Sequence, residues 1–172
     1  MVVDDADGNQ IGSVGAGANV IADNDLGVEL TNDAFGNDVA GNTIGTDADA
    51  TLDLGNFAWG VIVRNGSTNN TIGPGNVIAF NDEAGVEIGT VGPSWMNTIT
   101  ENSIYQNSGL GIDLGGNGPT PNDPGDSDGG ANDLQNFPEL ATAISATGET
   151  TVTGTQDDPD VTGYRIEFFS SP

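Results

Sequence analysis

The sequence predicts an all-β protein folded as a parallel β-helix, a solenoid of about four to five coils whose short strands stack into parallel sheets. Internal repetition is the first observation that predicts it, since "NVIADN" at 19–24 returns as "NVIAFN" at 76–81. The second is a series of strands of about four residues, bounded by Gly or Asn, with no helical period anywhere in the chain. Units that alternate strands with helices are therefore excluded, and a solenoid fits best.

Four copies of one strand pattern define the coils. They are "GVEL" (27–30), "GVIV" (60–63), "GVEI" (85–88) and "GIDL" (111–114), which are 33, 25 and 26 residues apart. When such strands stack about 4.8 Å apart, alternate apolar residues point into the solenoid and the residues between them point outward. The outward column is then Glu29, Ile62, Glu87 and Asp113. We expect this column to form a solvated acidic stripe, because strongly acidic surfaces bring carboxylates together by chance.

Asparagines are expected at the corners between strands, because Asn and Gly tolerate left-handed backbone angles. The predicted corner residues are Asn19, Asn42, Asn70, Asn76, Asn97 and Asn102. Stacked amides also pass hydrogen bonds from coil to coil. A flat ligand-binding or ice-binding face is the alternative, but regular rows of threonine are missing.

The chain divides into three parts. Residues 1–116 carry the β-helix repeats, and 117–137 form an acidic loop of Gly, Pro and Asp that is too polar to bury. Residues 138–172 contain three alternating segments typical of antiparallel strands: "ELATAISA" (139–146), "TTVTGTQ" (150–156) and "YRIEFFSS" (164–171). These strands are expected either to cap the open end of the solenoid or to begin a β-sandwich.

The composition of the chain excludes several classes of partner and of catalytic chemistry. The 172 residues include 26 acids but only two basic residues, Arg64 and Arg165, which gives a formal charge of -24. Such a charge argues against nucleic acid or an anionic membrane as partner. The absence of His and Cys removes imidazole and thiolate chemistry and the usual zinc ligands, whereas Ca²⁺ remains a plausible ion. No apolar run is long enough to span a membrane.

Three stretches carry a resemblance: "NNTIGPGNVIAFNDEAGVEI" (69–88), residues 97–140, and "TTVTGTQDDPDVTGYRIEFFSSP" (150–172). They resemble the repeat region of large bacterial secreted or cell-surface proteins with right-handed parallel β-helix repeats, the pectate-lyase-like superfold. Residues 109–140 are the most specific part, although Asp133 stands where such sequences often have Asn. The resemblance implies the architecture and an extracellular or cell-surface setting within a longer protein. It implies no activity, because the superfold hosts lyases, hydrolases, adhesins and spacers.

Glu87 and Asp113 are the candidate catalytic pair. On adjacent coils they lie about 5 Å apart, a separation at which one carboxyl raises the pKa of the other and which retaining glycosidases use. Arg64 lies outward on the same strand as Ile62, two positions beyond it, and is the cation that a polysaccharide lyase needs beside a uronic carboxylate. A diagonal surface ion pair between Arg64 and Glu87 is the simpler expectation.

The acidic loop is the candidate metal site. Its oxygen donors are Asp123, Asp126, Asp128, Asn132 and Asp133. Hard oxygen ligands with Gly between them are the composition that a Ca²⁺ site requires, and a disordered acidic linker is the alternative. A weaker candidate is the loop with Asp47, Asp49 and Asp53.

Trp59 and Trp95 are candidate sugar-binding residues, because each stands where a loop meets a strand and aromatic rings stack on sugars. Phe57 and Tyr105 belong to the same group. Covering the corner of a coil is the alternative role for all four rings.

The function that we expect is a non-catalytic structural or adhesive module of an extracellular protein, with carbohydrate as its expected ligand. Its partners are then a polysaccharide or another surface protein, and an uncapped first coil favours end-to-end self-association. The alternatives are a fragment of a polysaccharide lyase or glycoside hydrolase and a Ca²⁺-dependent surface module.

Overall fold

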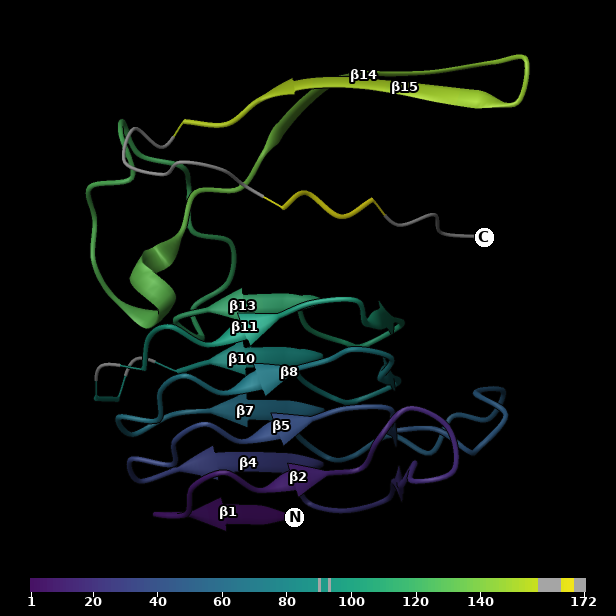
Figure 1. Cartoon of the computed structure of the whole chain (residues 1–172), viewed down its shortest axis with the longest axis vertical. Coiled ribbons are helices and arrows are strands. Elements are labelled where there is room, and N and C mark those ends of the chain that lie inside the picture. Colours follow the sequence, from purple (N-terminus) through teal and green to yellow (C-terminus); the bar gives the residue numbers. More distant parts are fainter. Residues whose placement is uncertain (90, 93, 158–164, 169–172) are drawn as a thin grey trace.

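The computed structural model describes residues 1–89, 91–92, 94–157 and 165–168. It is an all-β solenoid of about four turns built from three stacked parallel sheets, followed by a loop and an antiparallel strand pair (Figure 1). One sheet has five strands in the order β1 (Val2–Asp4), β4 (Val28–Thr31), β7 (Val61–Val63), β10 (Val86–Ile88) and β13 (Ile112–Leu114). This architecture confirms the predicted solenoid.

Two four-stranded parallel sheets complete each turn. The first is ordered β11 (Thr98–Ile99), β8 (Thr71–Ile72), β5 (Asp38–Val39) and β2 (Gln10–Ile11). The second is ordered β12 (Ser103–Tyr105), β9 (Val77–Ala79), β6 (Thr43–Ile44) and β3 (Val20–Ile21). Each complete coil thus contributes one strand to each of the three sheets, and the next coil begins again in the first sheet.

The register of the five-stranded sheet confirms the predicted repeat. Val28 pairs with Val61, Val61 with Val86, and Val86 with Ile112. The side chains of Val28, Val61 and Val86 are fully buried, and so are those of Leu30, Val63 and Ile88 two positions later. Together with Ile44, Ile72 and Ile78 from the other sheets they form one core along the solenoid axis. β-branched residues suit this narrow interior because they pack closely on a pleated surface.

Three ladders of asparagine run along the corners. Ladder 1 contains Asn9, Asn37, Asn70 and Asn97; ladder 2 contains Asn19, Asn42, Asn76 and Asn102; ladder 3 contains Asn24, Asn56, Asn81 and Asn107. In each ladder the backbone N–H and the Nδ2 of one asparagine donate to Oδ1 of the asparagine one coil later. The predicted ladder role is confirmed for all six asparagines, and buried amides are thereby satisfied. None of the six has the expected left-handed φ, which is adopted instead by residues directly before them, such as Gly41 and Asn69.

The acidic loop at 117–137 covers part of the last coil, although Ala131 and Asn136 are its only buried residues. Its short 3₁₀ segment η1 (Ala131–Leu134) contacts β13, and Ala131 joins the solenoid core. Asn132 extends ladder 1, since its Oδ1 accepts the Asn97 N–H at 3.0 Å and its Nδ2 donates to the Asn97 carbonyl at 2.6 Å. Ala131 and Leu134 on the core side, with Asn132 at the corner, let this polar loop imitate part of a coil.

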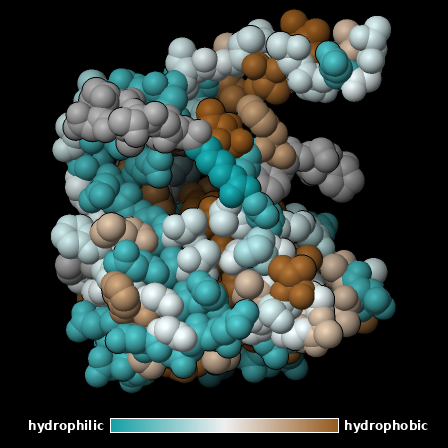
Figure 2. Space-filling model, viewed as in Figure 1, coloured by the Kyte–Doolittle hydropathy of each residue, from teal (hydrophilic) through white to brown (hydrophobic). Residues whose placement is uncertain are grey.

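The C-terminal strands do not cap the solenoid. β14 (Glu139–Ala146) and β15 (Glu149–Thr155) form an antiparallel hairpin that stands clear of the last coil in Figure 1. Every residue of β14 is exposed, and Figure 2 shows hydrophobic side chains on and beneath the hairpin, whereas hydrophilic ones dominate the solenoid. Leu140 and Ile144 are among the exposed apolar residues. The expected capping role therefore belongs to the acidic loop.

The third expected strand, at 164–171, is not formed by its described residues, Arg165 to Phe168. Here Glu167 accepts hydrogen bonds from the Thr100 hydroxyl and, at 2.7 Å, from the Glu101 N–H. Arg165 forms ion pairs with Glu101 and Glu167. These polar contacts attach the segment to the solenoid, and the segment does not pair with the hairpin as a third strand. Residue 164 and residues 169–171 lie outside the described part. Among the described residues no helix has the length and hydropathy needed to cross a membrane.

Candidate functional site

The predicted acidic column exists. Glu29, Ile62, Glu87 and Asp113 are successive partners in strands β4, β7, β10 and β13. Glu87 and Asp113 therefore occupy adjacent rungs, where strands lie about 4.8 Å apart. Stacking of the two candidate catalytic carboxylates follows from the three-residue register of β10 on β13.

The column is not the solvated stripe that we expected. Glu29 is 7% exposed, Ile62 2% and Asp113 8%, although all three point away from the core. The turn at 115–118 covers the end of the column, where the Gly118 N–H donates to Asp113 Oδ2 at 3.1 Å. The cover needs a glycine, because a Cβ on Gly116 would lie 2.7 Å from Glu87 Oε1.

Trp59 and Arg64 cover the rest of the column. The Trp59 indole donates its N–H to Glu87 Oε2 at 2.6 Å. Arg64 Nη2 lies 2.6 Å from Glu29 Oε1, and its Nε donates to the same oxygen at 2.7 Å. The predicted ion pair between Arg64 and Glu87 is therefore wrong. Arg64 reaches back one coil, to a nearly buried carboxylate, while Glu87 is already engaged by Trp59.

Burial raises the pKa of Glu87 above its usual value. The Trp59 hydrogen bond opposes this rise, the neighbouring Asp113 and Glu83 carboxylates add to it, and Arg64 again lowers the pKa. Asp113 Oδ1 is buried and accepts no hydrogen bond from the described residues. The raised pKa of Glu87 suits an acid, yet the turn at 115–118 lies against both carboxylates, through Gly116 at Glu87 and Gly118 at Asp113.

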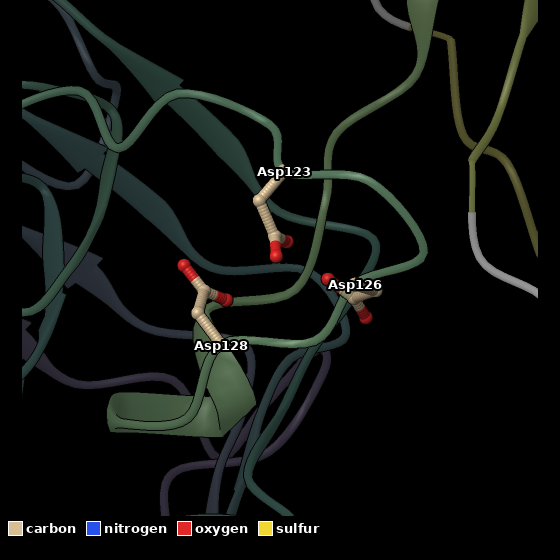
Figure 3. Close-up of side chains that lie close together, drawn as sticks. All are labelled: Asp123, Asp126 and Asp128. Atoms are coloured by element: carbon tan, nitrogen blue, oxygen red, sulfur yellow. The ribbon is translucent and has the colours of Figure 1, made fainter.

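The acidic loop brings together three of the five predicted metal ligands. Oxygens of Asp123, Asp126 and Asp128 all lie within 4.8 Å of one another, and Figure 3 shows the carboxylates converging from one loop. Asp123 accepts the Ser127 hydroxyl at 2.6 Å, whereas Asp128 Oδ1 is buried without a hydrogen-bond partner among the described residues. Three carboxylates at this spacing can hold a hard cation such as Ca²⁺.

Asn132 and Asp133 do not belong to this group. Asn132 is occupied in ladder 1, and Asp133 lies in η1. Sequence reasoning missed Asn136, which is nearly buried and fastens the loop. Its backbone N–H donates to Asp126 Oδ1 at 2.8 Å, and its Oδ1 accepts the Asp123 N–H at 3.0 Å. The available signal was the one shared by the other buried asparagines, an Asn shortly before a strand.

The weaker candidate loop is closed by its own backbone. Asp47 Oδ1 accepts the N–H of Thr51 at 2.7 Å and of Leu52 at 2.8 Å. These hydrogen bonds, that of Leu52 foremost, lower the pKa of Asp47. Within the described residues only Asp123, Asp126 and Asp128 form a group of three acids close enough to hold one ion.

The aromatic candidates occupy different surfaces. Trp59 lies on the acidic column, whereas Trp95 is 47% exposed. Tyr105 packs edge-on against Phe80 at a centroid distance of 6.0 Å, and its hydroxyl donates to the Ala50 carbonyl at 3.2 Å. Phe57 is the most exposed of the four. Sugar stacking by Trp95 stays a prediction.

Comparison of the chain with family models, with curated proteins and with solved structures found no match.

Proposed function

We propose that the chain is a rigid, non-catalytic structural module of an extracellular bacterial protein. The observation that carries the proposal is the set of asparagine ladders that ties each coil to the next through paired hydrogen bonds. Such ladders resist bending and local opening, because breaking one link leaves buried amide groups unsatisfied. The bacterial and extracellular setting is supported by the resemblance of the repeats. A polysaccharide or another surface protein is the partner that suits such a module.

Hydrogen exchange tests the structural role. The amides of Asn37, Asn42 and Asn56 should exchange slowly and together, because each donates to an asparagine of the following coil. Exchange of these amides as fast as that of the exposed hairpin amides would contradict a rigid solenoid.

A polysaccharide lyase or glycoside hydrolase is the alternative that the Glu87–Asp113 pair favours. The raised pKa of Glu87 suits a general acid, but the cover over the pair weighs against it. Incubation with acidic and neutral polysaccharides should release neither reducing ends nor unsaturated products. Product formation that disappears in Glu87→Gln would establish the enzyme and refute the non-catalytic role.

We also propose that Ca²⁺ orders the acidic loop. Three converging carboxylates and the unpartnered, buried Asp128 Oδ1 support this role. A bound ion offsets the repulsion between the carboxylates and binds the folded state selectively, so millimolar Ca²⁺ should raise the thermal midpoint. Asp128→Asn should abolish the rise, and Asp38→Asn, the same charge change on β5, should keep it. An equal rise in both variants would indicate general screening of the acidic surface.

A further inference from the structure

A groove of about 370 Å³ lies along ladder 3. Its carboxylates are Asp23, Asp53 and Asp82, and its rings are Phe57 and Phe80. Phe57 is one of the candidate sugar-binding rings, and neither the acidic column nor the acidic loop contains any of these five residues. The groove therefore has a chemistry of its own that the structural role does not explain.

Ladder 3 explains why these residues meet. Asp23 and Phe80 directly precede ladder asparagines, and Phe57 and Asp82 directly follow them, so the coils align these side chains in two columns. The groove extends to Gln106 on the fourth coil. Four coils at about 4.8 Å give it a length of roughly 14 Å parallel to the solenoid axis.

The loop at 46–54, blue in Figure 1, projects from the solenoid and supplies one wall. This wall is fixed at both sides. The Leu54 N–H donates to the Gly45 carbonyl at 3.1 Å, and the Leu54 carbonyl accepts the Asp23 N–H at 3.0 Å. Asp47 closes the loop from within. The groove is thus largely preformed, as ligand sites usually are.

Of the two rings, Phe57 is exposed, whereas Phe80 is half-buried and packs edge-on against Tyr105. Phe57 is 65% exposed, at a position where the equivalent residue one coil later is the polar Asp82. A polar residue would therefore suit this position on the surface. Phe80 adopts a left-handed φ of 62°, where the equivalent residues Asp23 and Gln106 are polar. A bulky ring is disfavoured in this conformation, and a polar residue would serve the corner better. Both rings line the groove beside the carboxylates, Phe57 with an exposed face and Phe80 at a cost in backbone conformation.

The groove carries negative charge that nothing nearby neutralises. Within the described residues the carboxylates of Asp23 and Asp82 form no hydrogen bond or ion pair, and Asp53 Oδ1 accepts only the Gly55 N–H at 3.3 Å. Both arginines are engaged elsewhere, with Glu29 and with Glu101. A ligand must therefore bring hydrogen-bond donors, and preferably positive charge, which disfavours uronic-acid polymers.

We propose that this groove binds a glycan of amino sugars in its protonated form. Ammonium groups would bind Asp23, Asp53 and Asp82, and the apolar faces of the sugar rings would stack on Phe57 and Phe80. A glycan suits the groove better than a lysine peptide does, because its repeat along the chain is comparable to the coil spacing and its rings are rigid. The proposal goes beyond the structural role and does not depend on it.

Calorimetric titration with a glucosamine tetramer tests the proposal at mildly acidic pH, where sugar amines are protonated and aspartates stay ionised. The N-acetylglucosamine tetramer is the matched neutral ligand and should bind about tenfold more weakly, since it lacks the ammonium groups. Equal affinity for both tetramers would refute the role of charge. Tighter binding of a trilysine peptide than of the glucosamine tetramer would refute the glycan as ligand.

Matched variants distinguish binding in the groove from nonspecific electrostatic attraction of a cationic glycan to an acidic protein. Asp82→Asn and Phe57→Ala should each weaken binding of the glucosamine tetramer about tenfold. Asp38→Asn and Phe35→Ala remove an exposed acid and an exposed ring outside the groove and should leave binding unchanged. All four variants are solvent-facing, and a retained thermal midpoint verifies their folding. Equal weakening by the groove variants and their controls would overturn the site.

Discussion

Trp59 donates its indole N–H to Oε2 of Glu87, one coil further along the solenoid, at 2.6 Å. The bond gives a half-buried carboxylate a donor in place of water and lays an aromatic ring over the acidic column. It also makes Trp59 a structural partner of the candidate acid, although both residues were first considered for separate roles.

Trp59→Phe should destabilise the solenoid by about 1–3 kcal/mol, because Glu87 loses a hydrogen bond in a poorly solvated position. The phenyl ring keeps most of the packing, so the loss reports mainly on the bond. Urea unfolding measures it, and Trp95→Phe is the control at an exposed ring. The role assigned to Trp59 would be wrong if both variants lost the same stability.

The raised pKa of Glu87 gives a pH dependence with a definite sign. The folded state holds the Glu87 proton more tightly than the unfolded chain does, so this group stabilises the fold at low pH. That contribution falls as pH rises from the ordinary pKa of a glutamate through the raised pKa of the folded state.

Glu87→Gln should therefore lose less stability than the native protein when pH rises through this interval. Urea unfolding at a series of pH values measures the difference. Glu149→Gln, at an exposed site on β15, removes the same charge and should follow the native curve more closely. Identical slopes for both variants would show that overall charge repulsion, and not burial of Glu87, sets the pH dependence.

Arg64→Met should destabilise the protein by about 1–3 kcal/mol, because it leaves the nearly buried Glu29 without its counter-charge. Adding Glu29→Met should recover part of the loss, since the unpaired carboxylate is then removed. A double-mutant cycle by chemical unfolding gives the coupling energy. Additive losses would indicate that the two side chains act independently.

Asn70→Ala should cost about 2–4 kcal/mol, because it removes the Nδ2 donor to Asn97 and leaves the buried Asn37 N–H without its acceptor. Thermal or urea unfolding checks the loss. Asn117→Ala is the control at an exposed asparagine outside the ladders. A loss no larger than that of the control would mean that the ladder adds little to stability.

The sequence was sufficient to predict the solenoid and its register because both follow from local patterns. Apolar alternation in "GVEI" sets which residues turn inward, and the intervals between copies set the pairing of Val61 with Val86. The corner asparagines were predictable for the same reason, although the division into three ladders was not.

The cover over the acidic column could not be predicted. It depends on Trp59 and Gly116 meeting Glu87 across neighbouring coils, and no local pattern encodes such a meeting. The contact of the acidic loop with the core could not be predicted either, because average polarity hides the two apolar residues that make it, Ala131 and Leu134. For the predicted metal ligands, composition alone could not show that Asp128 joins the group of three carboxylates whereas Asn132 bonds to Asn97 in ladder 1.

The hydrogen bonds of the three ladders all point the same way, from each coil toward the next one along the chain. Each ladder therefore has a direction: every inner asparagine accepts hydrogen bonds from the asparagine one coil before it and donates to the asparagine one coil after it. Asn9, Asn19 and Asn24 begin the three series as donors, with Oδ1 atoms suited to an incoming coil. A further coil, whether from a longer chain or a second molecule, continues all three ladders only when it is added head to tail. Two first coils placed face to face would set the Oδ1 atoms of these asparagines against one another, which disfavours growth with that polarity.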